Sequence, residues 1–448
     1  MIEIMRKGWC PGALAPMLSG DGYIFRLRLT NGVLTFSRAK SFAALARRYG
    51  NGAFDLSARA NLQMRGVSAE NIAPLQDELA ALGLLDSDPR VEAVRNVLPS
   101  PLAGFDPSAL IDTRPLVEAL EALLAREKTL HDLPAKFGFS IDGGGALPLN
   151  GISTDIDYSA VAGEAASRLL ISLGGVAAGK IAPDQLCATA EILARNFLRL
   201  RGEDRRMSAL VARLGVGPLL EGAGDVEPCS ALAGSSGDES IRSAAWRDDG
   251  LHRAARNNSG AGTAQRRIFG AQKCGDQYFV GAGLLFGRIE ADVLEALAQA
   301  AQDCGAAELR LTPWRAILAA GLSPQGAEKL LEPLRRLGFL LDGDDPRLAL
   351  SACPGAPACS SALGDVRAFA LALAPHWRAD AGRIHVSGCA KGCAYHGRAL
   401  TLVAESNGFA LVENGFARDE PVARGLDLAV CEQRLMQLSK ERAFERRL

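Results

Sequence analysis

Four cysteines in the last quarter of the chain have a spacing that suits metal chemistry. Cys353 and Cys359 form a C-x5-C pair, and Cys389 and Cys393 form a C-x3-C pair after one helical stretch. Four thiolates are the usual ligand set of a [4Fe–4S] cluster. Structural zinc sites usually use closer cysteine pairs in both halves, and the five-residue gap fits them poorly. The spacing therefore favours a cluster over zinc and over four unrelated core thiols.

Glycines flank these cysteines, and they support the same prediction. Gly355, Gly388 and Gly392 would let backbone N–H groups approach the cluster sulfides. The other six cysteines share no spacing, so we expect most of them to be buried thiols: Cys10, Cys187, Cys229, Cys274, Cys304 and Cys431.

Composition restricts the class of protein. The 448 residues include 50 Lys+Arg and 51 Asp+Glu, and 48% of them are hydrophobic. A net charge of -1 lacks the electrostatic footprint of a nucleic-acid or membrane-surface binder. No apolar run approaches the ~20 residues of a membrane span, and the first residues lack the apolar core of a signal peptide. We expect a cytoplasmic globular protein, where disulfides are rare and patterned cysteines more often bind metal.

An internal repeat organises the elements that must position the cysteines. Gly50, Ser57 and Gly83 recur as Gly305, Thr312 and Gly338, each 255 positions later. Each copy predicts strand, helix, strand and helix, over 23–29, 37–49, 54–64 and 69–82 in the first and 278–289, 292–304, 308–318 and 324–337 in the second. Two distant copies indicate a duplicated domain with insertions rather than a solenoid.

The remaining segments predict two further domains and a linker. Helical patterns over 115–126 and 183–200 and a strand pattern over 136–141 indicate an α/β domain between the copies. Residues 221–267 are rich in Gly, Ser, Ala and charge, which is typical of a linker. The predicted organisation is a first half-domain (1–105), an α/β domain (106–220), a linker (221–267), a second half-domain (268–347) and an α/β domain with the cysteines (348–448).

Together these features resemble the sulfite and nitrite reductase family. The resemblance rests on the cysteine spacing, the duplicated half-domains and the segments 7–12, 19–22, 55–66 and 388–393, and it spans nearly the whole chain outside the linker. It implies an α+β fold in which two ferredoxin-like half-domains form a pseudo-symmetric domain, accompanied by two α/β domains. It also implies a [4Fe–4S] cluster held by the four cysteines, beside which the reductases carry sirohaem.

Basic residues match positions at which this family binds anions. Arg59, Arg95 and Lys136 match the residues around the substrate oxyanion, so the resemblance implies catalytic roles for them, with Arg65 joining them in substrate binding. The reductases typically carry a second lysine where this chain has Gly138, and the second copy has Trp314 in place of Arg59. These departures favour a branch of the family that does not reduce a small oxyanion.

The resemblance is strongest to a branch that acts on a tetrapyrrole in cobalamin biosynthesis. It implies an O2-dependent hydroxylation with lactone closure on a polycarboxylate tetrapyrrole, and an external electron donor, NAD(P)H through a reductase or a ferredoxin. It leaves room for a second, non-haem iron, although the five histidines form no two-His, one-carboxylate pattern; His396 lies nearest the cysteines. Two alternatives stay open: a sirohaem-dependent sulfite or nitrite reductase, and a non-catalytic electron carrier or tetrapyrrole-binding protein.

Two glycine motifs resemble nucleotide-binding loops, but each lacks a residue that such a loop needs. Residues 174–180 satisfy G-x4-G-K, but Ile181 stands where a phosphate loop needs Ser or Thr. Residues 281–286 begin like a dinucleotide fingerprint but place Phe286 at the third glycine, so close strand packing explains them better.

Overall fold

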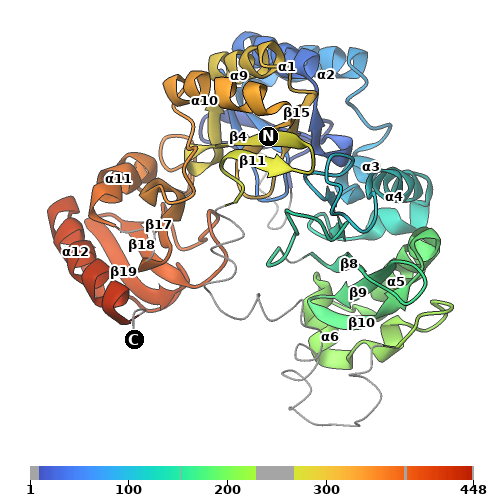
Figure 1. The fold of residues 1–448 in the computed structure, drawn as a ribbon. Coiled ribbons are helices and arrows are strands. Elements are labelled where there is room, and N and C mark those ends of the chain that lie inside the picture. Colours follow the sequence, from blue (N-terminus) through green and yellow to red (C-terminus); the bar gives the residue numbers. More distant parts are fainter. Residues whose placement is uncertain (1–9, 153, 229–266, 378–380, 446–448) are drawn as a thin grey trace.

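The computed structural model describes residues 10–152, 154–228, 267–377 and 381–445, arranged in three lobes (Figure 1). The half-domain pair lies at the top of the view. The middle lobe, residues 89–228, and the C-terminal lobe, residues 348–445, lie below it on opposite sides. No helix in the described ranges is long and apolar enough to cross a membrane.

The half-domain pair contains two five-stranded sheets that exchange their edge strands. The first has the order β1 (Met17–Ser19), β2 (Gly22–Leu27), β5 (Leu62–Val67), β4 (Ala53–Leu56) and β13 (Arg288–Glu290). The second has the order β11 (Gly270–Cys274), β12 (Gln277–Gly283), β15 (Ala316–Leu322), β14 (Glu308–Leu311) and β3 (Val33–Leu34). Since β13 pairs with β4 and β3 pairs with β14, each half-domain completes the sheet of the other.

Four amphipathic helices cover these sheets: α1 (Phe36–Tyr49), α2 (Ile72–Ala81), α9 (Ala291–Asp303) and α10 (Pro324–Arg336). Their apolar faces join the strands in one shared core, in which Phe42, Leu294 and Leu330 are fully buried. All four lie within three residues of the predicted helices, because the apolar spacing of an amphipathic helix is visible in the sequence.

The prediction of one long strand after the first helix of each copy was wrong. Two strands and a tight turn occupy each stretch, β4 and β5 in the first copy and β14 and β15 in the second. The Ser57 Oγ accepts from the N–H groups of Arg59 and Asn61, and the Thr312 Oγ1 accepts from that of Ala316. Such local side-chain bonds stabilise a turn, and in the first copy no Gly or Pro in residues 57–61 indicates it.

The middle lobe and the C-terminal lobe have the same sheet topology. The sheet of the middle lobe has the order β10 (Val176–Ile181), β9 (Arg168–Leu173), β8 (Ile156–Val161), β7 (Phe139–Asp142) and β6 (Val97–Pro99), which read from the other edge is β6 to β10. The sheet of the C-terminal lobe has the order β16 (Leu350–Ala352), β17 (Ile384–Ser387), β18 (Ala399–Glu405), β19 (Gly408–Gly415) and β20 (Ala423–Leu426). In each sheet the first three strands are parallel and the last two antiparallel. The helices are α3 (Pro89–Val94), α4 (Arg114–Arg126), α5 (Leu186–Leu200) and α6 (Met207–Leu214) in the middle lobe, and α11 (Val366–Leu373) and α12 (Leu428–Glu445) in the C-terminal lobe.

The predicted boundary at residue 105 needs correction. The strand β6 lies before it but belongs to the sheet of the middle lobe, where Val97 pairs with Phe139. A three-residue strand is too short to show a period in the sequence. The predicted linker begins inside this lobe as well, since Glu227 forms a bridge with Lys180, and most of the rest of 221–267 lies outside the described residues.

Both glycine motifs are structural. Gly174 and Gly175, with positive φ, form the turn between β9 and β10, so the G-x4-G-K segment is a hairpin and not a loop before a helix. An ideal Cβ on Gly281 would lie 1.6 Å from the Ile268 oxygen, which shows that close packing of β11 on β12 requires this glycine.

Candidate functional site

Parallel strand pairing brings two of the four cysteines to one sheet edge. Cys353 follows β16 directly, and Cys389 follows β17 after Gly388. Because these strands run parallel, with Ala352 opposite Val386, the chain leaves both at the same edge of the sheet. The Gly388 N–H donates to the Cys353 Sγ at 3.2 Å.

The other two cysteines lie in the loops that continue from these strands. Burial raises the pKa of Cys393, and the negative charges of Cys389, Cys353 and Cys359 raise it further. The other three thiols therefore lie within electrostatic reach of Cys393. An ideal Cβ on Gly388 would lie 2.5 Å from the Ala362 Cβ and 3.5 Å from the Cys353 Sγ, so only glycine allows the two loops to approach this closely.

Four thiols on two neighbouring loops are the donor set that a [4Fe–4S] cluster needs. Thiolates around one zinc would each lie about 2.3 Å from it, whereas the iron corners of a cubane hold the sulfurs farther apart. The residues present are thus suited to a [4Fe–4S] cluster.

Each half-domain contacts one of the two cysteine loops. The Arg65 Nη2 and the Ser19 Oγ both donate to the carbonyl of Ala358, at 2.8 and 2.7 Å, next to Cys359. The Arg315 Nη2 donates to the carbonyl of Ala394 at 2.8 Å, next to Cys393. The cysteine loops are therefore positioned by three separate parts of the chain.

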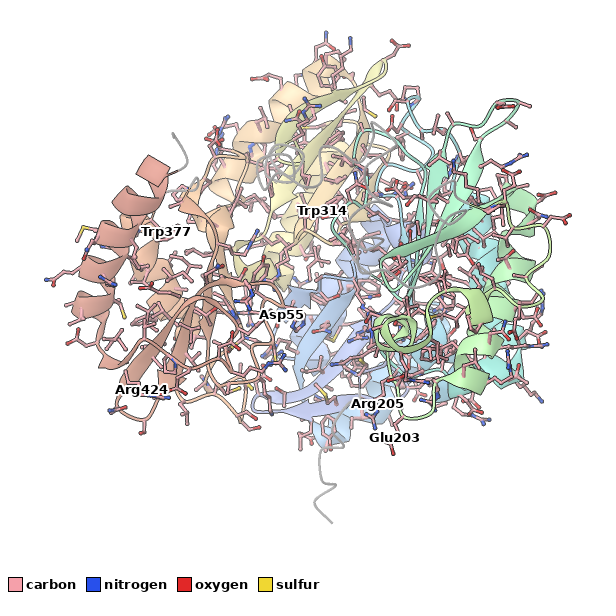
Figure 2. All side chains as sticks on the ribbon, turned by 90° about the horizontal axis from the view of Figure 1, so that it is seen from below. Asp55, Glu203, Arg205, Trp314, Trp377 and Arg424 are labelled. Carbon is pink, nitrogen blue, oxygen red and sulfur yellow. The ribbon has the colours of Figure 1, made fainter. Side chains whose placement is uncertain are left out.

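Arg65 is a support of the cysteine loop and not the substrate-binding residue that the resemblance implied. Its side chain is 3% exposed and pairs with Asp21 at 2.8 Å and Asp55 at 3.2 Å. Asp55 also accepts from Arg367 of the C-terminal lobe at 3.0 Å, and Figure 2 shows Asp55 where the half-domain pair meets that lobe. Since all three nitrogens of Arg65 already bond to the protein, the side chain does not face a ligand.

Arg59, Arg95 and Lys136 do come together. Arg59 and Arg95 line a narrow cavity between the first half-domain and the middle lobe, with about 20 Å³ of free space. The Arg59 Nη2 donates to the Lys136 carbonyl at 2.8 Å. Burial lowers the pKa of Arg59, as does the nearby Arg206. Arg95 is already neutralised by Asp86 and Glu121, each at 3.1 Å, which leaves Arg59 and Lys136 as the freer charges.

Three further residues join this site, and sequence reasoning had not placed them there. Arg28 lines the same cavity, with a buried Nε that has no partner in the described part of the chain, and burial lowers its pKa to about 10. Arg206 donates to the Lys136 carbonyl at 2.7 Å. Burial lowers the pKa of His396, and the charges of Lys136, Arg206, Arg315 and Arg59 lower it further. This shared field places His396, from the C-terminal lobe, beside cations of both other parts. No sequence motif indicated that Arg28 or Arg206 would belong to this site.

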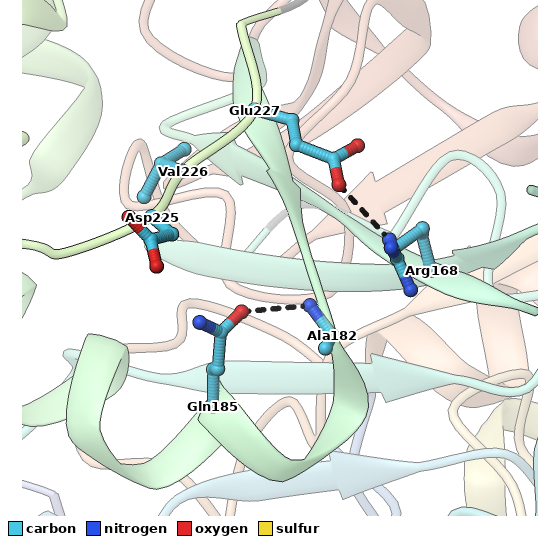
Figure 3. A pocket seen from close by; sticks show the side chains of 6 residues that line it. All are labelled: Arg168, Ala182, Gln185, Asp225, Val226 and Glu227. Carbon is cyan, nitrogen blue, oxygen red and sulfur yellow. Dashed lines mark hydrogen bonds and ion pairs between the residues drawn. The ribbon is translucent and has the colours of Figure 1, made fainter.

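A larger hollow has no part in this site. It encloses about 400 Å³ on the surface of the middle lobe (Figure 3). Its walls include Arg168, paired with Glu227 at 3.1 Å, and Gln185, which accepts from the Ala182 N–H at 2.9 Å. None of the predicted site residues lines it.

Comparison with known families now decides the relationship. The model of the nitrite/sulfite reductase ferredoxin-like half domain matches residues 15–82 and 271–337. The model of the nitrite and sulphite reductase 4Fe-4S domain matches residues 91–228. A precorrin-3B synthase from Sinorhizobium sp is 32% identical over 436 residues, which are 94% of this chain and 86% of that protein.

The chain belongs to the nitrite and sulfite reductase family. This confirms the resemblance that the motifs carried, and it confirms the α+β fold with duplicated half-domains. A chloroplastic ferredoxin–nitrite reductase of Arabidopsis thaliana is 26% identical over 399 residues, 83% of this chain and 65% of that protein. The structure of the Mycobacterium tuberculosis NirA protein shares the fold, with a TM-score of 0.67 at 19% identity over 87% of this chain and 74% of that one.

The family model described as a 4Fe-4S domain and the four patterned cysteines lie in different lobes. The model described as a 4Fe-4S domain matches the middle lobe, where Cys187 is the one cysteine between residues 91 and 228. The four patterned cysteines lie in the C-terminal lobe, which repeats the same strand order. The match therefore identifies a fold that occurs twice in this chain, and the second copy carries the thiols.

Proposed function

We propose that this protein is an oxidoreductase that acts on a tetrapyrrole: a precorrin-3B synthase, which hydroxylates precorrin-3A at C20 with O2 and closes a lactone in cobalamin biosynthesis. The similarity to the Sinorhizobium precorrin-3B synthase, which extends over 94% of the chain, carries the proposal. The absence of a lysine at Gly138 supports it independently.

Gly138 stands where the reductases typically carry a second lysine. An ideal Cβ at this position would lie 2.8 Å from the Arg59 Nη1. Since a Cβ needs more than 3 Å, a lysine here would displace the Arg59 guanidinium. In this structure the guanidinium donates to the Lys136 carbonyl. Because the Arg59 Nη1 ends a flexible side chain, this shift would cost little, and it is the missing lysine charge that favours the synthase over the sirohaem-dependent reductase.

Cys353, Cys359, Cys389 and Cys393 would hold the [4Fe–4S] cluster. When bound, such a cluster supplies single electrons at a potential that the surrounding charges and hydrogen bonds set. The protein's own contribution is to fix the loops through Gly388, Ala358 and Ala394. A second, non-haem iron remains part of the proposal without an assigned ligand set.

The basic residues would bind the acetate and propionate arms of the substrate. Guanidinium groups bind carboxylates through paired N–H donors, and Arg59 would be the main one. Arg28 and Arg206 would contribute less, because Arg28 pairs with Glu92 at 3.6 Å and Arg206 with Asp155 at 3.1 Å. Lys136, which is exposed, adds a mobile ammonium group. Arg95 would act mainly by holding the wall of the cavity, because its charge is already paired.

His396 would hold or accept a proton near the reacting face. The surrounding cations lower its pKa, so the imidazole is neutral at pH 7 and available as a base. O2 as co-substrate, a ferredoxin or an NAD(P)H-linked reductase as electron donor, and a cytoplasmic location complete the proposal.

The decisive experiment uses protein purified without oxygen. Iron, sulfide and pigment are measured first, and the protein is then incubated with precorrin-3A, a chemical reductant and O2, with the mass of the product recorded. We expect four irons and four sulfides per cluster, no sirohaem absorption and a hydroxylated lactone. A sirohaem spectrum with turnover of sulfite or nitrite would establish the reductase. A cluster with neither reaction would indicate an electron carrier or a tetrapyrrole-binding protein.

A further inference from the structure

The two arginines that contact the cysteine loops differ in their charge environment. Arg65 contacts the Ala358 carbonyl but pairs with two carboxylates, Asp21 and Asp55. Arg315 contacts the Ala394 carbonyl, and no carboxylate among the described residues pairs with it. The contact beside Cys359 is therefore neutralised, whereas the contact beside Cys393 carries a net positive charge.

The neighbours of Arg315 add to this positive charge. Burial lowers the pKa of Arg315 to about 10, and Arg383 and Arg367 lower it further, whereas Asp55, which already pairs with Arg65 and Arg367, raises it. Arg383 donates to the Ser351 Oγ at 3.1 Å and lies over the Tyr395 ring at 5.1 Å, again without a carboxylate in the described ranges. Arg367 shares Asp55 with Arg65, and its buried Nε has no partner in the described part of the chain.

The imidazole beside these cations contributes no charge at pH 7. His385, on β17, is 1% exposed, and burial lowers its pKa to about 4, so the ring is neutral at pH 7. Its Cε1 lies 3.4 Å from the ideal Cβ position of Gly392, directly behind the Cys389–Cys393 loop. Four arginines lie at this interface, Arg65, Arg315, Arg367 and Arg383. The carboxylates that pair with them among the described residues are Asp21 and Asp55.

Arg315 has the left-handed backbone that the equivalent turn of the first copy also has. Its φ is 58°, in the left-handed region that favours glycine, and the equivalent residue of the first copy, Ala60, has a φ of 53°. An arginine with positive φ is strained by on the order of 1 kcal/mol. Its stem packs on Gly287, whose ideal Cβ would lie 3.0 Å from the Arg315 Cδ.

Four arginines that share two carboxylates leave an excess of positive charge at this interface, which a nearby anion would stabilise. A cluster with four thiolate ligands is negatively charged, and it gains one further negative charge when it accepts one electron from the external donor. We propose that Arg315, supported by Arg383 and Arg367, is the positioning residue whose charge stabilises the reduced cluster and keeps its reduction potential high. The inference rests on the proposed four-cysteine cluster and is independent of the identity of the substrate.

The test is a redox titration of the full-length protein, followed by the EPR signal of the reduced cluster. A charge about 10 Å away at an effective dielectric constant of about 20 changes a one-electron equilibrium by roughly tenfold. We therefore expect Arg315→Gln to lower the ratio of reduced to oxidised cluster about tenfold at a fixed potential, a shift of about 59 mV.

Matched variants separate charge from loop positioning. Arg315→Lys keeps the charge but loses the planar guanidinium, and we expect its potential to stay near that of the wild type. Arg310→Gln removes a buried arginine of the same half-domain, which pairs with Glu308 and bonds the carbonyls of Asn31 and Ala103 away from the cysteines, and should leave the potential unchanged. If Arg315→Gln does not retain a cluster, Arg383→Gln provides the same measurement.

Each outcome decides the matter. An unchanged potential in Arg315→Gln, or in Arg383→Gln where that variant is used, or an equal shift in Arg315→Lys and Arg315→Gln, would overturn the charge role. A wild-type protein without a reducible iron–sulfur signal would instead refute the proposed cluster, and this inference with it.

Discussion

The middle lobe and the C-terminal lobe share one sheet topology but have different residues at the same edge. Ser100 follows β6 as Cys353 follows β16, and each is followed by proline. The Gly143 N–H donates to the Ser100 Oγ at 2.7 Å, just as the Gly388 N–H donates to the Cys353 Sγ at 3.2 Å. The first lobe thus completes the contact with a hydroxyl group, and the second presents a thiol.

This difference shows how one scaffold serves two purposes. In the middle lobe the loop closes on itself, because buried Asp142 accepts from the N–H groups of Gly144 and Leu149. In the C-terminal lobe the corresponding loops carry four thiols and depend on arginines from the half-domain pair. The patterned thiols are thus found in one copy of the topology, and a serine stands at the position of Cys353 in the other.

The largest effect is expected from the cluster ligands. Cys389→Ser should remove the visible iron–sulfur absorption and most of the bound iron and sulfide, since a hydroxyl is a far poorer ligand for the cluster than a thiolate. Cys187→Ser, in the middle lobe, is the matched control and should change neither. Normal iron and sulfide in the Cys389 variant would show that the ligand assignment is wrong.

A smaller effect is expected from the ion pairs that join the half-domain pair to the C-terminal lobe, here called the clamp: Arg65 with Asp21 and Asp55, and Asp55 with Arg367. Arg65→Gln leaves Asp21 and Asp55 without their buried partner and should lower the free energy of unfolding by about 3–5 kcal/mol in urea titrations. Arg114→Gln removes an exposed pair with Asp112 and should cost less than about 1 kcal/mol. Equal losses in the two variants would contradict the clamp.

The pH dependence of stability should differ between the lobes at equivalent strand positions. His385 on β17 corresponds to Ser140 on β7. The folded pKa of about 4 lies below the ordinary 6.5, so the unfolded state binds the proton more readily. Stability is therefore fully present above pH 6.5 and is lost as the pH falls toward 4, by on the order of 3 kcal/mol. His385→Gln should flatten this part of the pH–stability curve, and an unchanged slope would refute the assignment.

The smallest effect is expected in the middle lobe. Ser100→Ala removes the hydroxyl that accepts from the Gly143 N–H and should cost about 1–2 kcal/mol in unfolding free energy, with iron and sulfide unchanged. A loss of bound iron in this variant would mean that the middle lobe also contributes to the cluster.

Sequence patterns predicted the helices of the half-domains well but failed for short strands and turns. The apolar period of α1 or α9 is local, whereas the hairpin at Ser57 depends on side-chain bonds that no period reveals. The exchange of β3 and β13 between the half-domains could not be predicted, because strands of two and three residues carry no recognisable pattern. The duplication of the middle lobe in the C-terminal lobe was missed for the same reason.

The sequence by itself determined the chemistry available: four thiols in C-x5-C and C-x3-C pairs, and basic residues at Arg59, Arg65, Arg95 and Lys136. The tertiary structure decided which of those charges are free. Arg65 and Arg95 are neutralised by carboxylates from other segments, whereas no carboxylate among the described residues forms an ion pair with Arg315. Residue type and spacing are properties of the chain, but charge compensation depends on neighbours far apart in sequence, and only folding brings those together.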